Sequence, residues 1–438
     1  MSSATRRVAV TGMAIVSPLG DTKKALWDAL SAGRSGVGWL TTVPSGVVPV
    51  KFGADAAGFR GKIDDFGPLD KDRKKAIRKG LKVMCRECQM GIAAAQKALT
   101  DADFAPAEAD RERTGITFGA EYMLTLPEEF IESIKQCLDA EGRFEFDRWA
   151  KEGMPKMSPL WLLKYLPNMP ASHLAIFNDL RGPNNSLTLR EAASNAAVGE
   201  AYQTIIRGSA DAILAGATGT RLHPMKLIHA VQQEELANGE REPTRASRPF
   251  DRDRTGMVPG EGAGAIMLEE LTTAEARGAT IYGEIVAGSS SSTIGRRLVA
   301  RREKAMTNAL QAVLEAAGCA ADEVGHLHAH GLSTRSCDAE EARAINNVFA
   351  ARKDPIPVVA AKSSFGNLGA GSGMVELIAS LMALKEGRLF PVLNYENPDP
   401  QCPINVVTDS QVSAGESFVT LNVTPQGQAT AVMVRGYG

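Results

Sequence analysis

Three histidines spaced two residues apart are the first candidates for chemistry in this sequence. His326, His328 and His330 lie at the end of a probable strand, so all three would share one of its faces. Such a face could bind a metal ion, but no acidic or cysteine ligands accompany it, and we expect no metal site. His330 differs because Gly331 follows it at the carboxyl end of the strand, where α/β folds place functional groups. His330 is therefore a candidate catalytic residue.

Two cysteines, Cys85 and Cys88, form a C-x-x-C motif. A redox pair of this kind belongs at the N-terminus of a helix that follows a strand. Here the motif falls inside a predicted helical stripe from Lys74 to Leu99, so packing in the core is the favoured interpretation. The six cysteines of the chain are scattered and predict no disulfide framework.

Two glycine-rich segments look like nucleotide-binding loops but occur in the wrong context. Segment 260–264, Gly-Glu-Gly-Ala-Gly, precedes an apolar strand instead of following one, so a close backbone crossing explains it better. Segment 362–371 begins with its lysine and has no Gly-Lys-Ser/Thr, which excludes a P-loop. The sequence therefore predicts no nucleotide site in either segment.

The elements that position these residues follow an α/β pattern. Short apolar runs bounded by glycine alternate with helical stretches, as in a mainly parallel sheet covered by helices. Strands are predicted at 8–12, 212–216, 263–268, 281–286 and 324–329, and a helix at 304–317. A polar connector at 270–278 precedes a second series of strands and helices that resembles the first. We therefore divide the chain into two halves of related architecture, 1–270 and 271–438, packed as one unit.

Composition excludes several classes of protein. The chain has 438 residues, with 49 Lys and Arg against 51 Asp and Glu and 44% hydrophobic residues, a globular composition. A net charge of −2 predicts no general attraction to nucleic acid or anionic membranes. No apolar run approaches the ~20 residues that a membrane span requires. Since no secretion signal is visible at the N-terminus, we expect a soluble, cytoplasmic protein.

Two segments depart from the regular pattern, and a third is strongly basic. Segment 137–156 has no clean period and is a candidate surface insertion. Segment 289–292 reads as a polar turn before a basic run at 296–304. A basic helix is predicted at 71–86, and its charged residues are Lys71, Arg73, Lys74, Lys75, Arg78, Lys79, Lys82 and Arg86.

Motifs in a fixed order along nearly the whole chain resemble the β-ketoacyl-acyl-carrier-protein synthases, and most closely the synthase I/II branch. The matching segments are 10–20, 27–36, 181–184, 208–216, 249–264, 329–341 and 362–376. The resemblance implies a thiolase fold, which has two duplicated α/β halves in five alternating layers and usually forms a dimer. It also implies no resident cofactor, because the substrate arrives on the phosphopantetheine arm of an acyl carrier protein.

The departures from the family pattern concern the catalytic residues. The resemblance implies a nucleophilic cysteine at the N-terminus of a buried helix, and an ungapped alignment of 182–201 puts Glu191 in its place. Of the family's two histidines, His330 is kept and Asn367 replaces the second, while Lys362 of the same motif remains. Cys337 lies near His330 in sequence, but we expect it in a loop without the helix N-terminus that would lower its pKa.

Two functions are compatible with these residues. In the first, the protein does not condense, because a carboxylate cannot replace the thiolate that accepts an acyl group. It would then bind acyl chains or carrier protein, or act as the partner subunit of an active ketosynthase, in a homodimer or heterodimer. In the second, His330 and Asn367 form an oxyanion hole for malonyl decarboxylation or another acyl-thioester reaction, with Glu191 as base or acid.

The charge of Glu191 favours the first function. The helix dipole, together with Lys362 or a protonated His330 if either lies close, would keep Glu191 ionised, and its charge would repel a malonyl carboxylate and an enolate. Since carrier proteins are acidic, the basic segments 71–86 and 296–304 are a candidate carrier-protein surface. A solvated face balanced by nearby aspartates is the alternative explanation.

Overall fold

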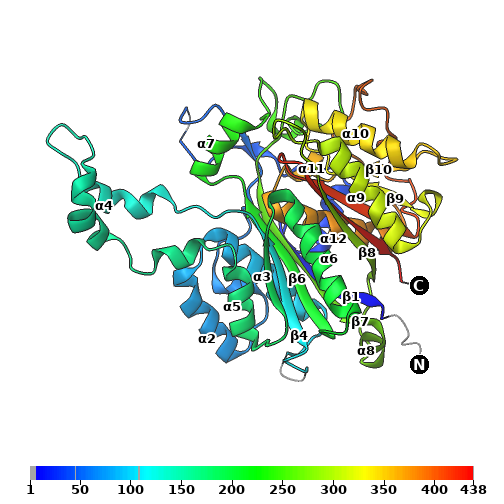
Figure 1. The fold of residues 1–438 in the computed structure, drawn as a ribbon, viewed down its shortest axis with the longest axis horizontal. Helices are drawn as coiled ribbons and strands as arrows, with labels where there is room; N and C mark the ends of the chain where they lie inside the picture. Colours follow the sequence, from blue (N-terminus) through cyan, green and yellow to red (C-terminus); the bar gives the residue numbers. More distant parts are fainter. Residues whose placement is uncertain (1–5, 45, 107–108, 438) are drawn as a thin grey trace.

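Ten strands form one mixed sheet, which a computed structural model describes over residues 6–44, 46–106 and 109–437 (Figure 1). Five of them lie in the order β5-β4-β6-β7-β1, and the other five continue the sheet as β8-β12-β11-β9-β10. Their bounds are β1 Val8–Val16, β4 Thr114–Ala120, β5 Asn184–Thr188, β6 Ala212–Thr220, β7 Glu261–Glu270, β8 Gly283–Ser292, β9 His326–His328, β10 Val358–Val359, β11 Ser417–Val423 and β12 Gln428–Arg435. Strands β2 (Gly38–Trp39) and β3 (Phe52–Gly53) form a separate small hairpin.

The two sets of five strands have the same topology. When each set is numbered in chain order, its strands lie in the order 3-2-4-5-1. In each set three strands are parallel, β5-β4-β6 and β10-β9-β11, and the fifth strand, β7 or β12, is antiparallel to both neighbours. Within the sheet, as far as the described residues show, the two sets pair through Val8–Val10 and Gly283–Ile285. The exact division at residues 270 and 271 stays a prediction.

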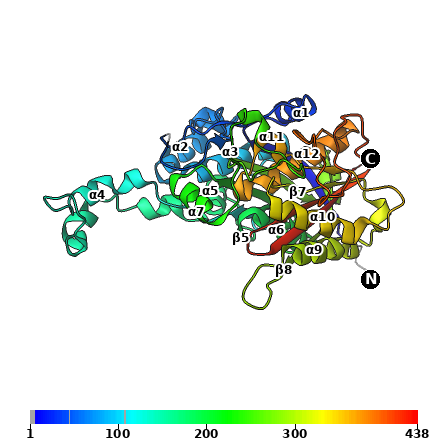
Figure 2. The same cartoon turned by 90° about the horizontal axis from the view of Figure 1, so that it is seen from above.

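Helices above, between and below the two sets complete five alternating layers. α3 (Arg86–Asp101) and α5 (Met169–Asn178) lie against the first set, while α9 (Arg302–Ala317) packs on the second and α10 (Arg335–Phe349) packs on α9 (Figures 1 and 2). Between the sets lie α6 (Ala193–Ile206) and α12 (Ser372–Glu386), which contact strands of both. The five predicted layers are therefore present.

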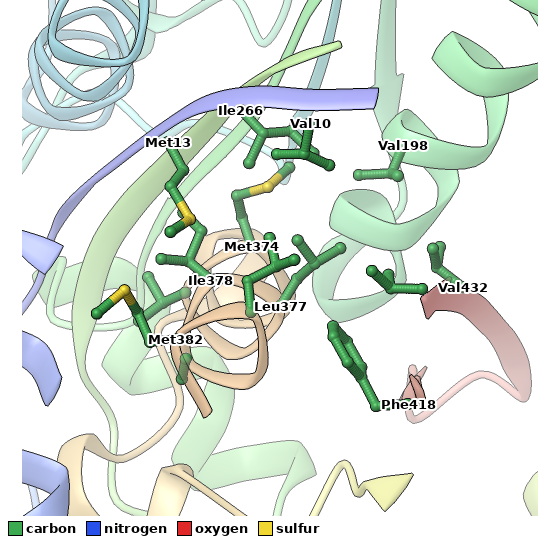
Figure 3. Close-up of a cluster of buried hydrophobic side chains, with 14 of the residues drawn as sticks. Val10, Met13, Val198, Ile266, Met374, Leu377, Ile378, Met382, Phe418 and Val432 are labelled. Carbon is green, nitrogen blue, oxygen red and sulfur yellow. The ribbon is translucent and has the colours of Figure 1, made fainter. Parts of the chain in front are cut away.

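The middle layer carries much of the hydrophobic core. Every residue of α12 from Ser372 to Ala383 is buried. In Figure 3 the side chains of Met374 and Leu377 lie between Ile266 of β7 and Phe418 of β11. A helix that is buried on all sides cannot shift without opening the core on both faces. The residues just before α12 and in its first turns are therefore held rigidly.

A long arm, residues 126–168, projects from the body in both views (Figures 1 and 2). It contains α4 (Ile131–Lys135) and several short helical turns between β4 and α5. Its aromatic side chains pack on one another, with Phe144 beside Trp149 and Phe130 beside Trp161. The predicted surface insertion at 137–156 lies in this arm, which extends beyond the predicted bounds on both sides.

The remaining helices connect the layers. They are α1 (Lys23–Ser31), α2 (Lys71–Gly80), α7 (Pro224–Gln233), α8 (Leu271–Ala276) and α11 (Lys362–Phe365). Among the helices of the described ranges, none combines the length and the apolar character needed to cross a membrane.

The prediction of one helical stripe over 74–99 is wrong. The chain forms α2, leaves the helix after Val83, and begins α3 at Arg86 with Cys85 as its N-cap. The break is stabilised by the arm, since the Cys85 amide donates to the Lys164 carbonyl oxygen at 3.2 Å. The C-x-x-C motif therefore lies at a helix N-terminus and not inside a helix.

The predicted polar turn at 289–292 is also wrong. These four serines continue β8 and pair with residues 428–431 of β12. Backbone hydrogen bonds to β12 outweigh the low strand preference of serine. The connection that we predicted begins only after Ser292.

Candidate functional site

Charged residues lie just beyond the carboxyl ends of three adjacent parallel strands, at one edge of the sheet. Glu121 follows β4, Arg190 and Glu191 follow β5, and Arg221 follows β6. Because the carboxyl ends of parallel strands meet at the same edge, these side chains converge there, where α/β folds assemble their sites.

Glu191 lies in a short 3₁₀ turn, Arg190–Ala192, immediately before the buried helix α6. Arg190 has φ of 50°, in the left-handed region, which costs about 1–3 kcal/mol and is common at functional sites. The Glu191 residue is 1% exposed. Its carboxylate contacts the guanidinium of Arg221 closely, accepts a hydrogen bond from Asn367 Nδ2 at 3.0 Å, and lies 3.4 Å from Arg190 Nε.

The electrostatics keep Glu191 ionised. Burial by itself raises the pKa of its carboxyl, but Arg221, Arg190 and the amide of Asn367 outweigh burial and hold that pKa well below the ordinary value. Our expectation that Lys362 would be a charge partner of Glu191 is wrong, because Lys362 pairs with Glu376 instead. The partners of Glu191 come from the strand ends beside it.

Glu191 belongs to a larger buried group of charges, which we call the Arg221 cluster. Arg221 also lies 3.7 Å from Glu121 and 3.1 Å from Glu234, and Lys226 of α7 lies 3.0 Å from Glu121 and 2.5 Å from Glu87. The members of the cluster are Glu87, Glu121, Arg190, Glu191, Arg221, Lys226 and Glu234. Sequence reasoning missed all of them except Glu191. The available signal was a charged residue directly after a buried strand, as at Glu121 and Arg221.

His330 and Lys362 lie together at the equivalent edge of the second set of strands. Lys362 Nζ donates to the His330 carbonyl oxygen at 2.8 Å, lies 3.3 Å from His330 Nδ1, and forms a close ion pair with Glu376. Glu376 in turn accepts a hydrogen bond from Asn422 Nδ2 at 2.8 Å. We call His330, Lys362, Glu376 and Asn422 the Lys362 cluster.

His330 is a neutral imidazole in this environment. Burial first, and then the nearby charge of Lys362, lower the pKa of His330 well below its ordinary value. Since the lysine ammonium can only donate, His330 Nδ1 accepts and its proton resides on Nε2. Within the described ranges, Nε2 has no hydrogen-bond partner. His330 therefore presents a buried N–H donor that is available to a ligand.

Buried carboxylates hold the loop that carries His330. Glu341 accepts from the backbone amides of His330 at 2.6 Å and Gly331 at 2.8 Å, and Asp338 accepts from the amide of Leu332 at 3.1 Å. Burial raises the pKa of Glu341 to about 8 and that of Asp338 to about 6. These contacts fix where the imidazole of His330 can lie.

Asn367 is placed by a tight turn at the end of α11. Gly366 has φ of 68°, and a Cβ there would lie 2.6 Å from the Val258 carbonyl oxygen, so only glycine fits. Asn367 Oδ1 accepts from the Gly369 amide at 3.0 Å, which directs Nδ2 toward Glu191. The structure thus brings Glu191 and Asn367 into direct contact, and His330 and Lys362 into direct contact.

The other sequence candidates lie elsewhere. His326 Nε2 and His328 Nδ1 both contact the hydroxyl of Ser380, at 3.1 Å and 2.8 Å, so these two histidines pack behind the site. Across the described part of the chain, no group of three or more His, Cys, Asp or Glu is arranged for a metal ion. The loop position that we expected for Cys337 is wrong, since it lies in the first turn of α10. Burial nevertheless raises the pKa of Cys337 well above its ordinary value.

The glycines of segment 260–264 mark a close backbone crossing, as predicted. A Cβ on Gly262 would lie 2.7 Å from the Val16 carbonyl oxygen, and one on Gly260 would lie 2.9 Å from the Phe365 carbonyl oxygen. The crossing brings β7 against the segment that carries Asn367, whose amide donates to the Val258 carbonyl oxygen at 2.8 Å.

Comparison with known sequences identifies two matching domains. Residues 5–274 match the β-ketoacyl synthase N-terminal domain, and residues 282–396 match the β-ketoacyl synthase C-terminal domain. A 3-oxoacyl-[acyl-carrier-protein] synthase 2 from Synechocystis sp. is 33% identical over 405 residues, which cover 92% of this chain and 91% of that protein. The protein of the same name from Staphylococcus aureus is 29% identical over 433 residues, 99% of this chain and 98% of its own.

Solved structures share the fold over almost the whole chain. A β-ketoacyl synthase from Burkholderia phymatum has a TM-score of 0.82 at 27% identity and covers 99% of this chain and 100% of its own. The ishigamide ketosynthase/chain length factor has a TM-score of 0.84 at 24% identity, with the same coverage. The predicted thiolase fold is confirmed, and the chain is a ketosynthase-like protein that belongs to the β-ketoacyl synthase family.

Proposed function

We propose that this protein is a ketosynthase-like subunit that handles acyl thioesters on acyl carrier protein without condensing them. One observation carries the proposal: the side chain at the expected place of the nucleophile is the carboxylate of Glu191, clamped by Arg221 and Asn367. The substrate would reach the site on the phosphopantetheine arm of the carrier protein. The chain would act as a chain-length-factor-like or acyl-binding partner subunit.

The chemistry of Glu191 supports the loss of condensation. A carboxylate that attacked a thioester would form a mixed anhydride, which the departing thiolate would readily reverse. Moreover, a carboxylate with a lowered pKa and two close cationic neighbours is a weak nucleophile and a weak base. Four further charged side chains of the Arg221 cluster surround Glu191 and its two arginines. They are Glu87, Glu121, Lys226 and Glu234.

A second candidate function is malonyl decarboxylation or another acyl-thioester reaction that uses His330 and Asn367. It is favoured by the unpartnered N–H of His330, which could donate to an enolate oxygen. It is opposed by Asn367, whose Nδ2 already donates to Glu191. A malonyl group would have to displace an ion-paired carboxylate to reach both donors.

Incubation with malonyl acyl carrier protein separates the two functions. We expect the purified protein to release no CO2 above the rate of the carrier protein alone. The variant Glu191→Gln removes the charge and keeps the shape of the side chain, so any release that it gains identifies the charge as the block. Turnover by the unmodified protein that disappears in His330→Ala would instead establish the decarboxylase.

The variant Glu191→Cys tests whether the rest of the site is competent. A thiol at this position faces the guanidinium groups of Arg221 and Arg190, which favour the thiolate. We expect the variant to become acylated by an acyl carrier protein substrate, and we expect Glu191→Ser to remain unmodified, as intact-mass measurement would record. Failure of Glu191→Cys to acylate, with an unchanged fold, would mean that the loss extends beyond one residue.

We also propose a carrier-protein surface on α2. Lys71, Lys75, Arg78 and Lys79 of this helix are exposed, and the described residues give them no ion-pair partner, whereas Lys74 lies 3.4 Å from Asp64. The second basic segment, 296–304, lies on the opposite side of the molecule from α2 in Figure 2. The two segments therefore do not form one continuous surface, as we had expected. Arg86, the last basic residue of the first segment, forms an ion pair with Glu261.

Charge reversal tests this surface. The double variant Lys75→Glu/Lys79→Glu should weaken binding of malonyl acyl carrier protein about tenfold or more, because electrostatic steering to α2 reverses sign. The matched control is Arg296→Glu/Arg297→Glu on the other side, which should leave the Kd unchanged. Isothermal titration of both variants at low salt decides between them, and an unchanged Kd for the α2 variant would remove this surface from the proposal.

The partner subunit is a second copy of this chain or an active ketosynthase. β5 lies at the edge of the sheet with mostly exposed residues, so one chain can extend the sheet of another. Native mass spectrometry of the protein expressed alone should show twice its mass of 46.5 kDa if it forms a homodimer. A monomer that becomes a heterodimer on co-expression with an active ketosynthase would support the chain-length-factor arrangement.

A further inference from the structure

Three sulfur atoms meet at the root of the arm, beside Glu87 of the Arg221 cluster, whose Oε2 lies 4.0 Å from Cys85 Sγ. Cys85 Sγ lies 3.6 Å from Cys88 Sγ and 3.6 Å from Met123 Sδ, and Cys88 Sγ lies 3.8 Å from the same Met123 Sδ. Sulfur is large and polarizable, so the thioether of Met123 can follow a movement of either thiol. The two thiols are in direct contact without a covalent bond between them.

The two cysteines differ in the way that thiol–disulfide exchange requires. Cys85 is the N-cap of α3, a helix of 16 residues, and it is half-buried, so it is the more exposed of the two cysteines. Cys88 lies one turn further on and is fully buried. The contact with Cys85, and then burial, raise the pKa of Cys88 well above its ordinary value, which keeps it a thiol at rest.

We propose that Cys85 and Cys88 form a reversible dithiol–disulfide site whose substrate is a small-molecule disulfide. Cys85 thiolate attacks one sulfur of the disulfide, whose S–S bond breaks and releases one small thiolate. Cys88 then loses its proton to that thiolate and attacks the sulfur of Cys85, and the second small thiolate leaves. Two electrons pass from the protein to the small disulfide, and one bond between Cys85 and Cys88 is formed.

The geometry needs little rearrangement. The two sulfurs must approach from 3.6 Å to the S–S bond length of about 2 Å. The other cysteines do not offer this arrangement, since none of Cys137, Cys319, Cys337 and Cys402 has a sulfur contact with a second cysteine in the described part of the chain. The exchange uses neither Glu191 nor a carrier protein, so the proposal does not depend on the proposed function.

Peptide mapping tests the site directly. The folded protein is equilibrated in buffers with increasing ratios of oxidised to reduced glutathione, free thiols are blocked with an alkylating reagent, and the protein is digested with trypsin. Because cleavage after Arg86 separates the two cysteines, a disulfide between them joins peptide 83–86 to peptide 87–97. We expect the joined peptides to accumulate with oxidised glutathione and to disappear on reduction.

Single variants assign the two roles. Cys88→Ser should trap a glutathione adduct on Cys85, at a rate at least ~10 times that of adduct formation on Cys88 in Cys85→Ser, because only Cys85 is reachable. Cys319→Ser is the matched control, since Cys319 is also half-buried, and it should leave the joined peptides unchanged. The proposal is overturned if Cys85 and Cys88 are alkylated independently at every glutathione ratio. It is equally overturned if the joined peptides form only in urea-unfolded protein.

Discussion

The two sets of strands carry different groups of charged residues at equivalent edges of the sheet. In the first set the ends of β4, β5 and β6, together with α3 and α7, carry the Arg221 cluster, in which two arginines and a lysine hold four glutamates. In the second set the ends of β9 and β10 carry His330 and Lys362, with one ion pair to Glu376. The same topology thus supports a dense charge cluster on one side and a sparse one on the other.

The difference shows which half of the site offers a hydrogen-bond donor without a partner among the described residues. The Lys362 cluster keeps a neutral His330 with an unpartnered N–H, so it still offers a donor to a ligand. In the Arg221 cluster the carboxylates and guanidinium groups form ion pairs with one another. Glu191 also accepts a hydrogen bond from Asn367. We infer that the first set provides structure and charge at the site, while the second provides donors.

Breaking the Arg221 cluster at its centre should have the largest effect. Arg221→Met leaves Glu191, Glu121 and Glu234 buried without their shared cation, and we expect a loss of about 4 kcal/mol in the free energy of unfolding. Urea unfolding measures it. Arg207→Met, at an exposed arginine after α6, is the matched control and should stay within about 0.5 kcal/mol of the unmodified protein. If Arg221→Met lowered the free energy of unfolding no more than the control does, Arg221 would not stabilise the cluster.

The sparse cluster should respond less to loss of its cation. Lys362→Met leaves only Glu376 without an ion pair, and that residue can take up a proton because burial already raises its pKa. We expect a loss of about 3 kcal/mol. The pKa of His330 should also rise toward its ordinary value, because a neighbouring positive charge has been removed. NMR titration of the imidazole checks this shift, and an unmoved His330 pKa would contradict the assigned contact.

Glu191→Gln should lower stability by about 2 kcal/mol at pH 7, since Arg221 keeps Glu121 and Glu234 as partners. The difference should depend on pH. The folded pKa of Glu191 is depressed, so its stabilisation is present above the ordinary pKa of 4.5 and is lost as pH falls below it. The gap between the two proteins should therefore narrow by up to about 1.4 kcal/mol per pH unit below 4.5. Unfolding curves from pH 7 to pH 3 measure it, and a gap independent of pH would mean that Glu191 is not ionised.

Much of the fold could be predicted from the sequence because its strands are short, apolar and bounded by glycine. The predicted strands at 212–216 and 263–268 lie within β6 and β7, and the helix at 304–317 lies within α9. The break between α2 and α3 could not be predicted from periodicity, because it depends on the Lys164 carbonyl of the distant arm. Ser289 to Ser292 form a strand for a similar reason, since β12 lies far along the chain.

The candidate site divides in the same way. His330, Lys362 and Asn367 belong to motifs that a sequence can display, and the structure places them at one edge of the second set of strands or beside Glu191. Arg221 and Lys226 belong to no motif, and only the folded chain shows that they face Glu191 and Glu121. Arg221 directly follows a buried strand, but the sequence does not show which residues lie at the neighbouring strand ends, so its partners could not be predicted.

The smallest effect is expected behind the Lys362 cluster, where Ser380 separates His326 from His328. The hydroxyl contacts His326 Nε2 at 3.1 Å and His328 Nδ1 at 2.8 Å, so Ser380→Ala leaves two buried ring nitrogens without this partner. We expect a loss of about 1 kcal/mol, because both groups are neutral, and no change in the pKa of His330. The exposed Ser158→Ala is the control for the loss of a hydroxyl. If Ser380→Ala moved the His330 titration as far as Lys362→Met does, the three histidines would act as one unit, and the donor role could not be assigned to His330 alone.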